Sequence, residues 1–292
     1  ENQLTKTEAE RLVAFTSGAN PLFIFGAVAV GFFHNVQLGI ILGFSHYVAN
    51  LFVGLIMRFY GRDKAPKEKK IRFSLKEAFK ALHHTRIQDK RPLGKLMGDA
   101  VISSINTLLM IGGFIILFSV INRIFSILHI TDLFASFAEF FFSLLRLPEA
   151  LSIPFISGLF EMTIGSQLAS ETEGVTLLKQ AIVVSFLLAF GGFSIQAQVA
   201  SLLAQSDIRF FPFFIARILQ GIFASIITLV IWKPVYLDRL ANESTIPVFS
   251  WFSGDHAWHI TEWLAEVGPP MTLLFLVIYI FVSFRMNMSA KK

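Results

Sequence analysis

The sequence predicts an all-α, polytopic integral membrane protein in which some helices are broken or re-entrant. Hydrophobic residues make up 54% of the 292-residue chain and charged residues only 15%, which is not the balance of a soluble domain. Residues 12–57 contain no Asp, Glu, Lys or Arg, and uncharged runs recur at 100–122, 180–206 and 267–284. About 20 apolar helical residues cross roughly 30 Å of hydrocarbon, so these runs predict spanning helices. Polar and small residues interrupt two apolar stretches, 151–170 and 189–207, which predicts the breaks.

The first uncharged run predicts a pair of helices near 12–33 and 38–57, joined by a turn. Asn20 followed by Pro21 is expected to break or start the first of these helices. His46 and Asn50 lie within the second helix. Hydrogen bonding between helices is the favoured role for His46, with a proton relay as the alternative, and Asn50 is expected either to join helices or to line a cavity.

Basic residues gather in the segment 58–98, which holds 13 of the 25 Lys and Arg residues against four acids. Basic segments beside spanning helices stay on the cytoplasmic side, so this segment is expected inside. Phe73, Phe79 and Leu82 recur among its basic residues, which favours a short amphipathic helix on the inner membrane face. Orientation is the favoured role of the charge, and binding of anionic lipid or a partner is the alternative. No nucleic-acid partner is expected, because no recognition motif accompanies the charge.

The later elements follow from the same rules. A helix near 100–122 crosses outward, and the Phe-rich stretch 133–145 is expected at the membrane interface. The stretch 232–268 has two basic residues against five acids and all four Trp residues, which predicts an external loop with an interfacial aromatic belt. A last helix near 269–286 returns inward. The chain opens on Glu1 without a signal peptide, and we expect a preceding segment to be missing.

The first interrupted stretch, residues 151–170, is where function is expected. Its apolar runs are cut by Pro154, Gly158, Glu161 and Gly165, which predicts a re-entrant hairpin or a broken helix. A carboxylate at membrane depth costs several kcal/mol, roughly 2.5 to 3.5 on insertion scales, and is retained mainly for function. The alternative is that Glu161 lies near an interface or pairs with a basic residue.

The second interrupted stretch is residues 189–207, where Gly191 and Gly192 break an apolar run. Two broken helices in one membrane domain are typical of secondary transporters, whose half-helix N-termini turn partial positive charge toward a substrate at mid-membrane. An anionic or carbonyl-bearing solute is therefore favoured. Arg217, inside the apolar run 210–231, is either a clamp for a carboxylate or the partner of Glu161. The predicted solute-binding residues are Glu161, Thr163, Gly165, Ser194, Gln196, Gln198 and Arg217.

Other chemistry has little support. The chain has no cysteine, which excludes disulfides, thiolate metal sites and cysteine nucleophiles. No HExxH, GxSxG, Walker or GxGxxG motif occurs in a supporting context, so no enzyme, cofactor or metal site is expected. His256, His259 and Glu262 have a spacing that could bind a metal, but ordinary interfacial residues are the favoured interpretation.

Three stretches carry a resemblance to a known family: SGANPLFIFGAVAVGFF, GFSHYVANLFVGLI and GLFEMTIGSQLA. With them the sequence resembles bacterial sporulation integral membrane proteins of the YlbJ (SpoVV) type, which carry a nucleoside-recognition or Gate domain, over essentially the whole chain. The resemblance implies a transporter-like protein in the cell membrane of a spore former, including the membrane around the forespore, that passes dipicolinate. A nucleoside is the alternative solute, because Gate domains also resemble parts of nucleoside transporters.

The expected organisation combines these observations. A first helical pair occupies 1–57, a basic cytoplasmic loop 58–98, a Gate-type membrane core 99–231, an external aromatic loop 232–268, and a last span with a basic tail 269–292. The expected partners are the lipid bilayer, a small anionic or nucleoside-like solute, and other sporulation membrane proteins. A non-transporting scaffold that recruits such proteins through its basic loop is the rival function.

Overall fold

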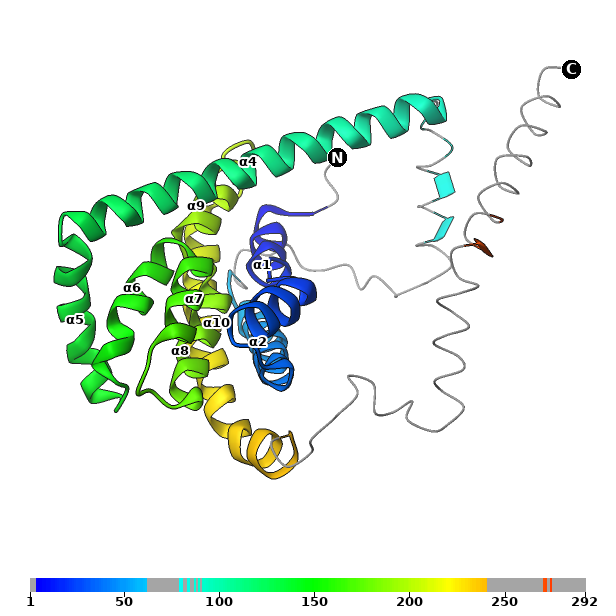
Figure 1. Ribbon diagram of the computed structural model, residues 1–292. Helices are drawn as coiled ribbons and strands as arrows, with labels where there is room; N and C mark the ends of the chain where they lie inside the picture. The colour runs from blue at the N-terminus through cyan, green and yellow to red at the C-terminus, as the bar shows by residue number, and fades with distance from the viewer. Residues whose placement is uncertain are drawn as a thin grey trace, which may run out of the picture. The chain divides into compact units, whose positions relative to one another are not determined.

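The computed structural model describes residues 4–61 and 91–240, together with a few isolated positions between 79 and 89 and between 270 and 274. The chain divides into two compact units, residues 1–238 and 239–292, and nearly all of the described residues belong to the first. The regular structure of this described part is entirely helical (Figure 1), which confirms the predicted fold class. Several predicted features lie outside the described residues: the amphipathic helix of the basic loop, the external loop beyond residue 240, the metal spacing at His256, His259 and Glu262, and the last span.

Four helices of the described part are long and apolar enough to cross a membrane. They are α2 (Val36–Met57), α4 (Leu93–Ile127), the stretch Leu177–Leu203 and the stretch Phe210–Asp238. Helices suit hydrocarbon because every backbone N–H and C=O inside them is bonded within the segment. At about 1.5 Å per residue, α4 is about 52 Å long, which exceeds the hydrocarbon thickness of about 30 Å. One end of α4 therefore extends beyond the apolar layer.

The helix predicted near 12–33 is divided into two helices, and the expected break or start at Asn20 and Pro21 is confirmed. The first, α1 (Lys6–Thr16), begins with a capping box between Thr5 and Glu8. Residues 17–20 are not helical, and the second helix, η1 (Phe23–Phe32), is wound as a π-helix. The interruption has a local cause, because a proline disfavours helical backbone at the residue before it. Asn20 then caps the new helix, since its Oδ1 accepts the Phe23 N–H at 2.7 Å.

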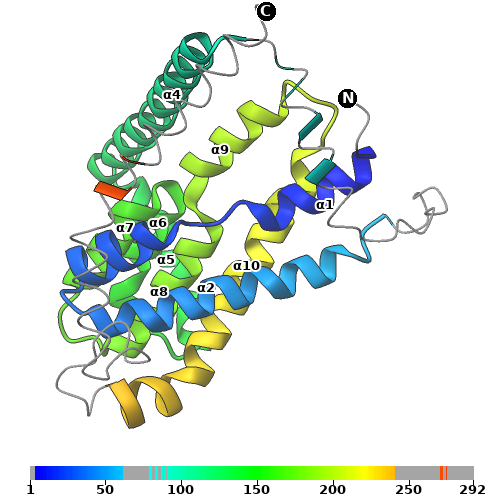
Figure 2. The ribbon, with the colours of Figure 1, turned by 90° about the vertical axis from the view of Figure 1, so that its right-hand side faces the viewer.

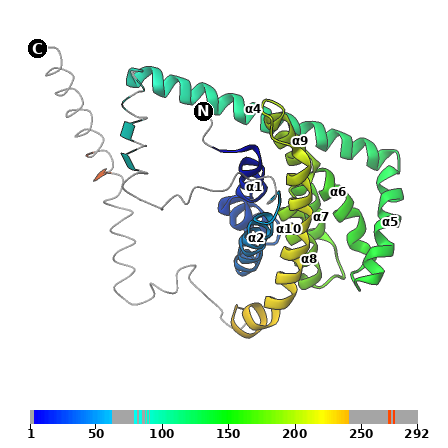
Figure 3. The same cartoon turned by 180° about the vertical axis from the view of Figure 1, so that it is seen from behind.

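The remaining helices form the core of the first unit. They are α5 (Ile130–Leu144), η3 (Glu149–Leu151), α6 (Ser152–Phe160), α7 (Met162–Glu171), α8 (Leu177–Phe190), α9 (Gly192–Leu203), α10 (Phe210–Ile231) and η4 (Trp232–Leu240). Helices α6, α7 and α8 lie side by side, with α5 against α6 (Figures 1 and 3). Helix α10 packs between α8 and α2 (Figure 2). Because η4 continues α10, the first nine residues of the predicted external loop are helical.

Candidate functional site

The first helix break lies at Glu161, between α6 and α7. Glu161 has an extended backbone (φ −142°, ψ 112°) and is only 2% exposed. Its carboxylate accepts the Ile164 N–H at 2.9 Å and the Thr163 hydroxyl at 3.0 Å. The carboxylate therefore caps the N-terminus of α7, where both free N–H groups and the helix dipole favour a negative charge. The broken helix predicted from residues 151–170 is confirmed.

The second break lies between α8 and α9. Gly191 and Gly192 both have positive φ, of 83° and 71°, a conformation that side-chain-bearing residues rarely adopt. The amide of Gln196 donates to the Phe190 carbonyl at 2.8 Å and so fills one of the carbonyls left free at the end of α8. Helix α9 begins without a side-chain cap. The first N–H groups of a helix have no partner inside the helix itself.

The two breaks lie against each other, backbone to backbone. A Cβ added at Gly192 would lie 3.1 Å from the Gly158 carbonyl oxygen and 3.1 Å from the Met162 nitrogen. Gly165 is closer still to the preceding helix, since a Cβ there would lie 2.2 Å from the Gly158 Cα. Only glycine allows such approaches. Gly192 therefore lets the two broken helices approach each other, whereas Gly165, which is predicted to bind solute, lets α7 pack closely against α6.

Buried polar side chains near this crossing lack partners. In the described part of the chain, the hydroxyls of Ser166 and Ser194, the Gln196 Oε1 and the Gln198 Nε2 are inaccessible to solvent and form no hydrogen bond. An unpaired polar group inside a protein costs about 1–3 kcal/mol, and such groups call for an explanation. Ser194, Gln196 and Gln198 are among the predicted solute-binding residues, and Ser166 lies in the first interrupted stretch, where function was expected.

Arg217 lies at a third break, between α1 and η1. Its guanidinium donates to the carbonyl oxygens of Ser17 and Ala14, the latter at 2.5 Å, and to the Asn50 Oδ1 at 3.2 Å. Among residues 4–61 and 91–240, Glu161 forms no ion pair, so the alternative in which Arg217 partners Glu161 is not realised. A cation at the C-terminal end of α1 is favourable because that end carries partial negative charge.

Other side chains complete this third break, which defines a cluster that we call the α1–η1 latch. His46 accepts the Ala19 N–H at 3.1 Å, the Tyr47 hydroxyl donates to the Ala19 carbonyl at 3.0 Å, and the Asn50 amide donates to Phe15. The hydrogen-bonding role favoured for His46 is the one observed. The residues of the latch outside the break are His46, Tyr47, Asn50, Arg217 and Gln220.

A second polar cluster, which the sequence reasoning missed, fastens α1 to α10. Arg209 donates through Nε and Nη2 to the two carboxylate oxygens of Glu10, at 2.8 and 3.0 Å, and Tyr60 joins the pair. These hydrogen bonds from Arg209 lower the pKa of the Glu10 carboxyl below its ordinary value of 4.5. The partners are 199 residues apart, so no local spacing signals the pair.

A bundle of apolar helices with two interrupted helices that cross at buried polar groups defines an integral membrane protein with broken helices. Residues 108–206 match the family described as Gate, nucleoside recognition. The chain is 50% identical over 306 aligned residues to the sporulation integral membrane protein YlbJ of Bacillus subtilis (strain 168). The alignment covers all of this chain and 73% of that protein. The chain therefore belongs to the family of sporulation integral membrane protein YlbJ, and the resemblance of the three stretches is confirmed.

The matched region contains both elements of the crossing, because it runs from within α4 to just beyond α9. Arg217 and the α1–η1 break lie outside it. No solved structure matches the chain.

Proposed function

We propose that this protein is a carrier, rather than an enzyme, that moves a small polar or anionic solute across the membrane in sporulation, and that the solute is dipicolinate. The observation that supports the proposal is the crossing, where buried side chains of α7 and α9 have unused hydrogen-bonding capacity. In hydrocarbon such capacity is costly unless a ligand, water or another polar group uses it. The similarity to a sporulation integral membrane protein supports a role in sporulation.

The electrostatics of the two breaks favour different positions for an anion. The N-terminus of α7 is already occupied by its own carboxylate, Glu161. The N-terminus of α9 has no side-chain cap, so it is the helix end that we expect to face a carboxylate of the solute. Ser194 lies in the first turn of α9 and Gln198 one turn further, where hydroxyl and amide groups can bond a small dicarboxylate or a carbonyl-bearing base.

A nucleoside is the second candidate solute, and the specific observation in its favour is the match of residues 108–206 to the nucleoside-recognition family. A nucleoside offers hydroxyl, amino and carbonyl groups in place of carboxylates. It would use the same unpaired amide and hydroxyl groups but would gain less from the helix N-terminus, because it has no negative charge.

Uptake into vesicles tests the proposal. We expect the full-length protein to take up labelled dipicolinate saturably, and the Glu161→Gln variant to lose at least about tenfold, because the variant weakens the cap that shapes the crossing. The matched control is Glu171→Gln, the same change at the exposed end of α7, which should transport at the original rate. Competition by unlabelled nucleosides but not by dicarboxylates would assign the solute to the second candidate. Absence of uptake for either solute would overturn transport and favour the scaffold.

A further inference from the structure

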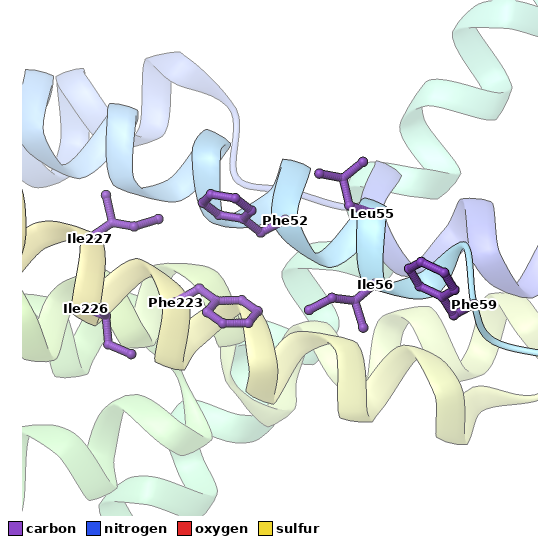
Figure 4. A pocket seen from close by; sticks show the side chains of 7 residues that line it. All are labelled: Phe52, Leu55, Ile56, Phe59, Phe223, Ile226 and Ile227. Atoms are coloured by element: carbon purple, nitrogen blue, oxygen red, sulfur yellow. The ribbon is translucent and has the colours of Figure 1, made fainter.

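An open groove of about 400 Å³ lies between α4 and α9, outside the predicted site residues. Six of its seven lining residues come from α4, and the seventh, Leu202, comes from α9. The lining residues are Asp99, Ile102, Ser103, Asn106, Thr107, Met110 and Leu202. A second groove of the described part, between α2 and α10, is lined only by hydrophobic side chains (Figure 4) and has the chemistry of a lipid-facing surface.

Three polar residues of the groove form a narrow stripe along α4. Asp99, Ser103 and Asn106 are separated by four and three residues, which places them on one face of the helix. The rest of the helix exposes large apolar residues such as Leu108, 67% exposed, and Ile116, 66% exposed. Neither the Ser103 hydroxyl nor the Asn106 amide has a hydrogen-bond partner among the described residues. In lipid such a stripe would be costly, so it requires water, a polar solute or other protein against it.

Helix α9 carries a matching stripe with the same spacing. Ser194, Gln198 and Ser201 are separated by four and three residues, so they also share one side of the helix, and Gln205 follows in the turn after α9. Burial falls steadily along it: Ser194 is fully buried, Gln198 is 8% exposed, and Ser201 and Gln205 are exposed. The stripe therefore begins at the break between α8 and α9 and ends at the surface. Gln198 lies one turn from Leu202, the residue that α9 contributes to the groove.

We infer that the groove between α4 and α9 is the route by which the polar solute reaches the crossing from one side of the membrane. The inference rests on the proposed function and names residues for it: Ser103 and Asn106 line the outer part of the route, and Ser201 and Gln198 lead inward. Helix packing supports it, because α4 packs on α9 within the same unit. The two stripes place polar groups on both helices, on α9 from the exposed Ser201 to the buried Ser194, whereas the groove between α2 and α10 has only hydrophobic side chains.

The mouth of the route lies at the end of α4 next to the basic segment. Asp99 is 45% exposed and pairs with Arg91 at 2.9 Å, and Asp89 pairs with the same guanidinium at 2.7 Å. Charged, exposed side chains belong outside the hydrocarbon. Because the basic segment is expected in the cytoplasm, the route opens on the cytoplasmic side.

Cysteine labelling tests the route, and the chain suits it because it contains no cysteine. The probe is a charged, membrane-impermeant thiosulfonate, applied to inside-out vesicles that contain the full-length protein, with any cysteine outside this chain replaced by serine. We expect Asn106→Cys and Ser201→Cys to react at least about ten times faster than Leu108→Cys, because the reactive thiolate forms in water and not in lipid. Leu108 is the matched control, two residues from Asn106 and on the opposite face of α4.

Added solute separates a route from a merely wet surface. Dipicolinate, or a nucleoside if uptake favours it, should slow the labelling of Asn106→Cys severalfold and leave Leu108→Cys unchanged. Equal, slow labelling of Asn106→Cys, Ser201→Cys and Leu108→Cys in a protein that still transports would overturn the route and leave the proposed function standing. Fast labelling that no solute slows, in a protein that transports, would also overturn it. Fast labelling in a protein that takes up neither solute would overturn the proposed function, on which the route depends.

Discussion

Two interruptions of apolar helices in this protein differ in what happens to the groups that they free. Both the α1–η1 break at residues 17–20 and the crossing at Glu161 and Gly192 release backbone groups that hydrocarbon cannot satisfy. In the α1–η1 latch, side chains from α2 and α10 take up these groups: Arg217 and Asn50 bond three carbonyls at the end of α1 and the start of the break. Side chains of the protein itself therefore satisfy the backbone groups of that break.

At the crossing, in contrast, buried polar side chains lack hydrogen-bond partners among the described residues. Ser166, Ser194 and Gln198 form no hydrogen bond with any described residue, although each is at least nine-tenths buried. The latch also contains unpaired atoms, on His46, Arg217 and Gln220, but each of these side chains uses its other polar atoms in the latch. The difference teaches that a broken helix alone does not mark a solute site. The distinguishing feature is polar capacity that the protein leaves unused.

Removing Arg217 should give the largest effect on stability. Arg217→Met leaves the carbonyls of Ala14 and Ser17 without donors, which should lower the free energy of unfolding by about 2–3 kcal/mol, at roughly 1–3 kcal/mol for each buried unpaired group with partial relaxation. The measurement is the thermal unfolding of the detergent-purified protein, followed by loss of the monodisperse peak. Arg217→Lys should recover part of the loss, since an ammonium can still donate to carbonyls.

A different outcome would weaken the comparison. If Arg217→Met unfolded at the same temperature as the unchanged protein but lost solute uptake, Arg217 would act on the solute, as first predicted, and not as a latch. Uptake per folded molecule that remains near the original level, together with reduced stability, would support the latch.

The packing of the crossing should give the next largest effect. Gly192→Ala combines a positive φ of 71° with a Cβ that would lie 3.1 Å from two backbone atoms, so we expect a loss of about 2 kcal/mol. The matched control is Gly174→Ala, which has the same φ of 71° but no atom within 4 Å of the added Cβ. It should cost only about 1 kcal/mol, for the backbone conformation alone. Equal losses in the two variants would contradict the close contact between the breaks.

The crossing could be predicted from the sequence because its signals are local. Two features are unusual in a membrane helix: the paired glycines in an apolar run, and the carboxylate of Glu161 between Gly158 and Gly165. Both can be recognised without knowing which other helices pack against them. The location of Arg217 could not be predicted, because its carbonyl acceptors lie about 200 residues away and any carbonyl looks the same in sequence. Asn20 and Pro21 mark the break in the span near 12–33, whereas the hydrogen bonds that α2 and α10 make to this break come from residues distant in the sequence.

The pair of Glu10 and Arg209 should give a smaller effect, because Arg209 is 53% exposed and solvent weakens the attraction. The pKa of Glu10 is lowered in the folded protein, so the stability from the pair is complete above the ordinary value of 4.5 and is lost as pH falls through the lowered value. Glu10→Gln should cost about 1 kcal/mol at pH 7 and less below pH 4. Thermal unfolding measured from pH 7 to pH 3.5 tests this, and a constant cost across that range would contradict the ion pair.

The smallest effect on stability, and the sharpest test of the comparison, should come from Gln198. Because its amide has no partner among the described residues, Gln198→Leu removes a buried unpaired group of similar volume, and stability should change by less than about 0.5 kcal/mol or rise. Uptake should nevertheless fall severalfold, since we expect the Gln198 amide to hydrogen-bond the solute. Gln220→Leu is the matched control, because Gln220 is fully buried and its amide donates to the His46 carbonyl at 3.3 Å. This variant should lose stability and keep its uptake per folded molecule. If Gln198→Leu destabilised the protein as much as Gln220→Leu, its amide would have a structural partner, and the contrast between the latch and the crossing would fail.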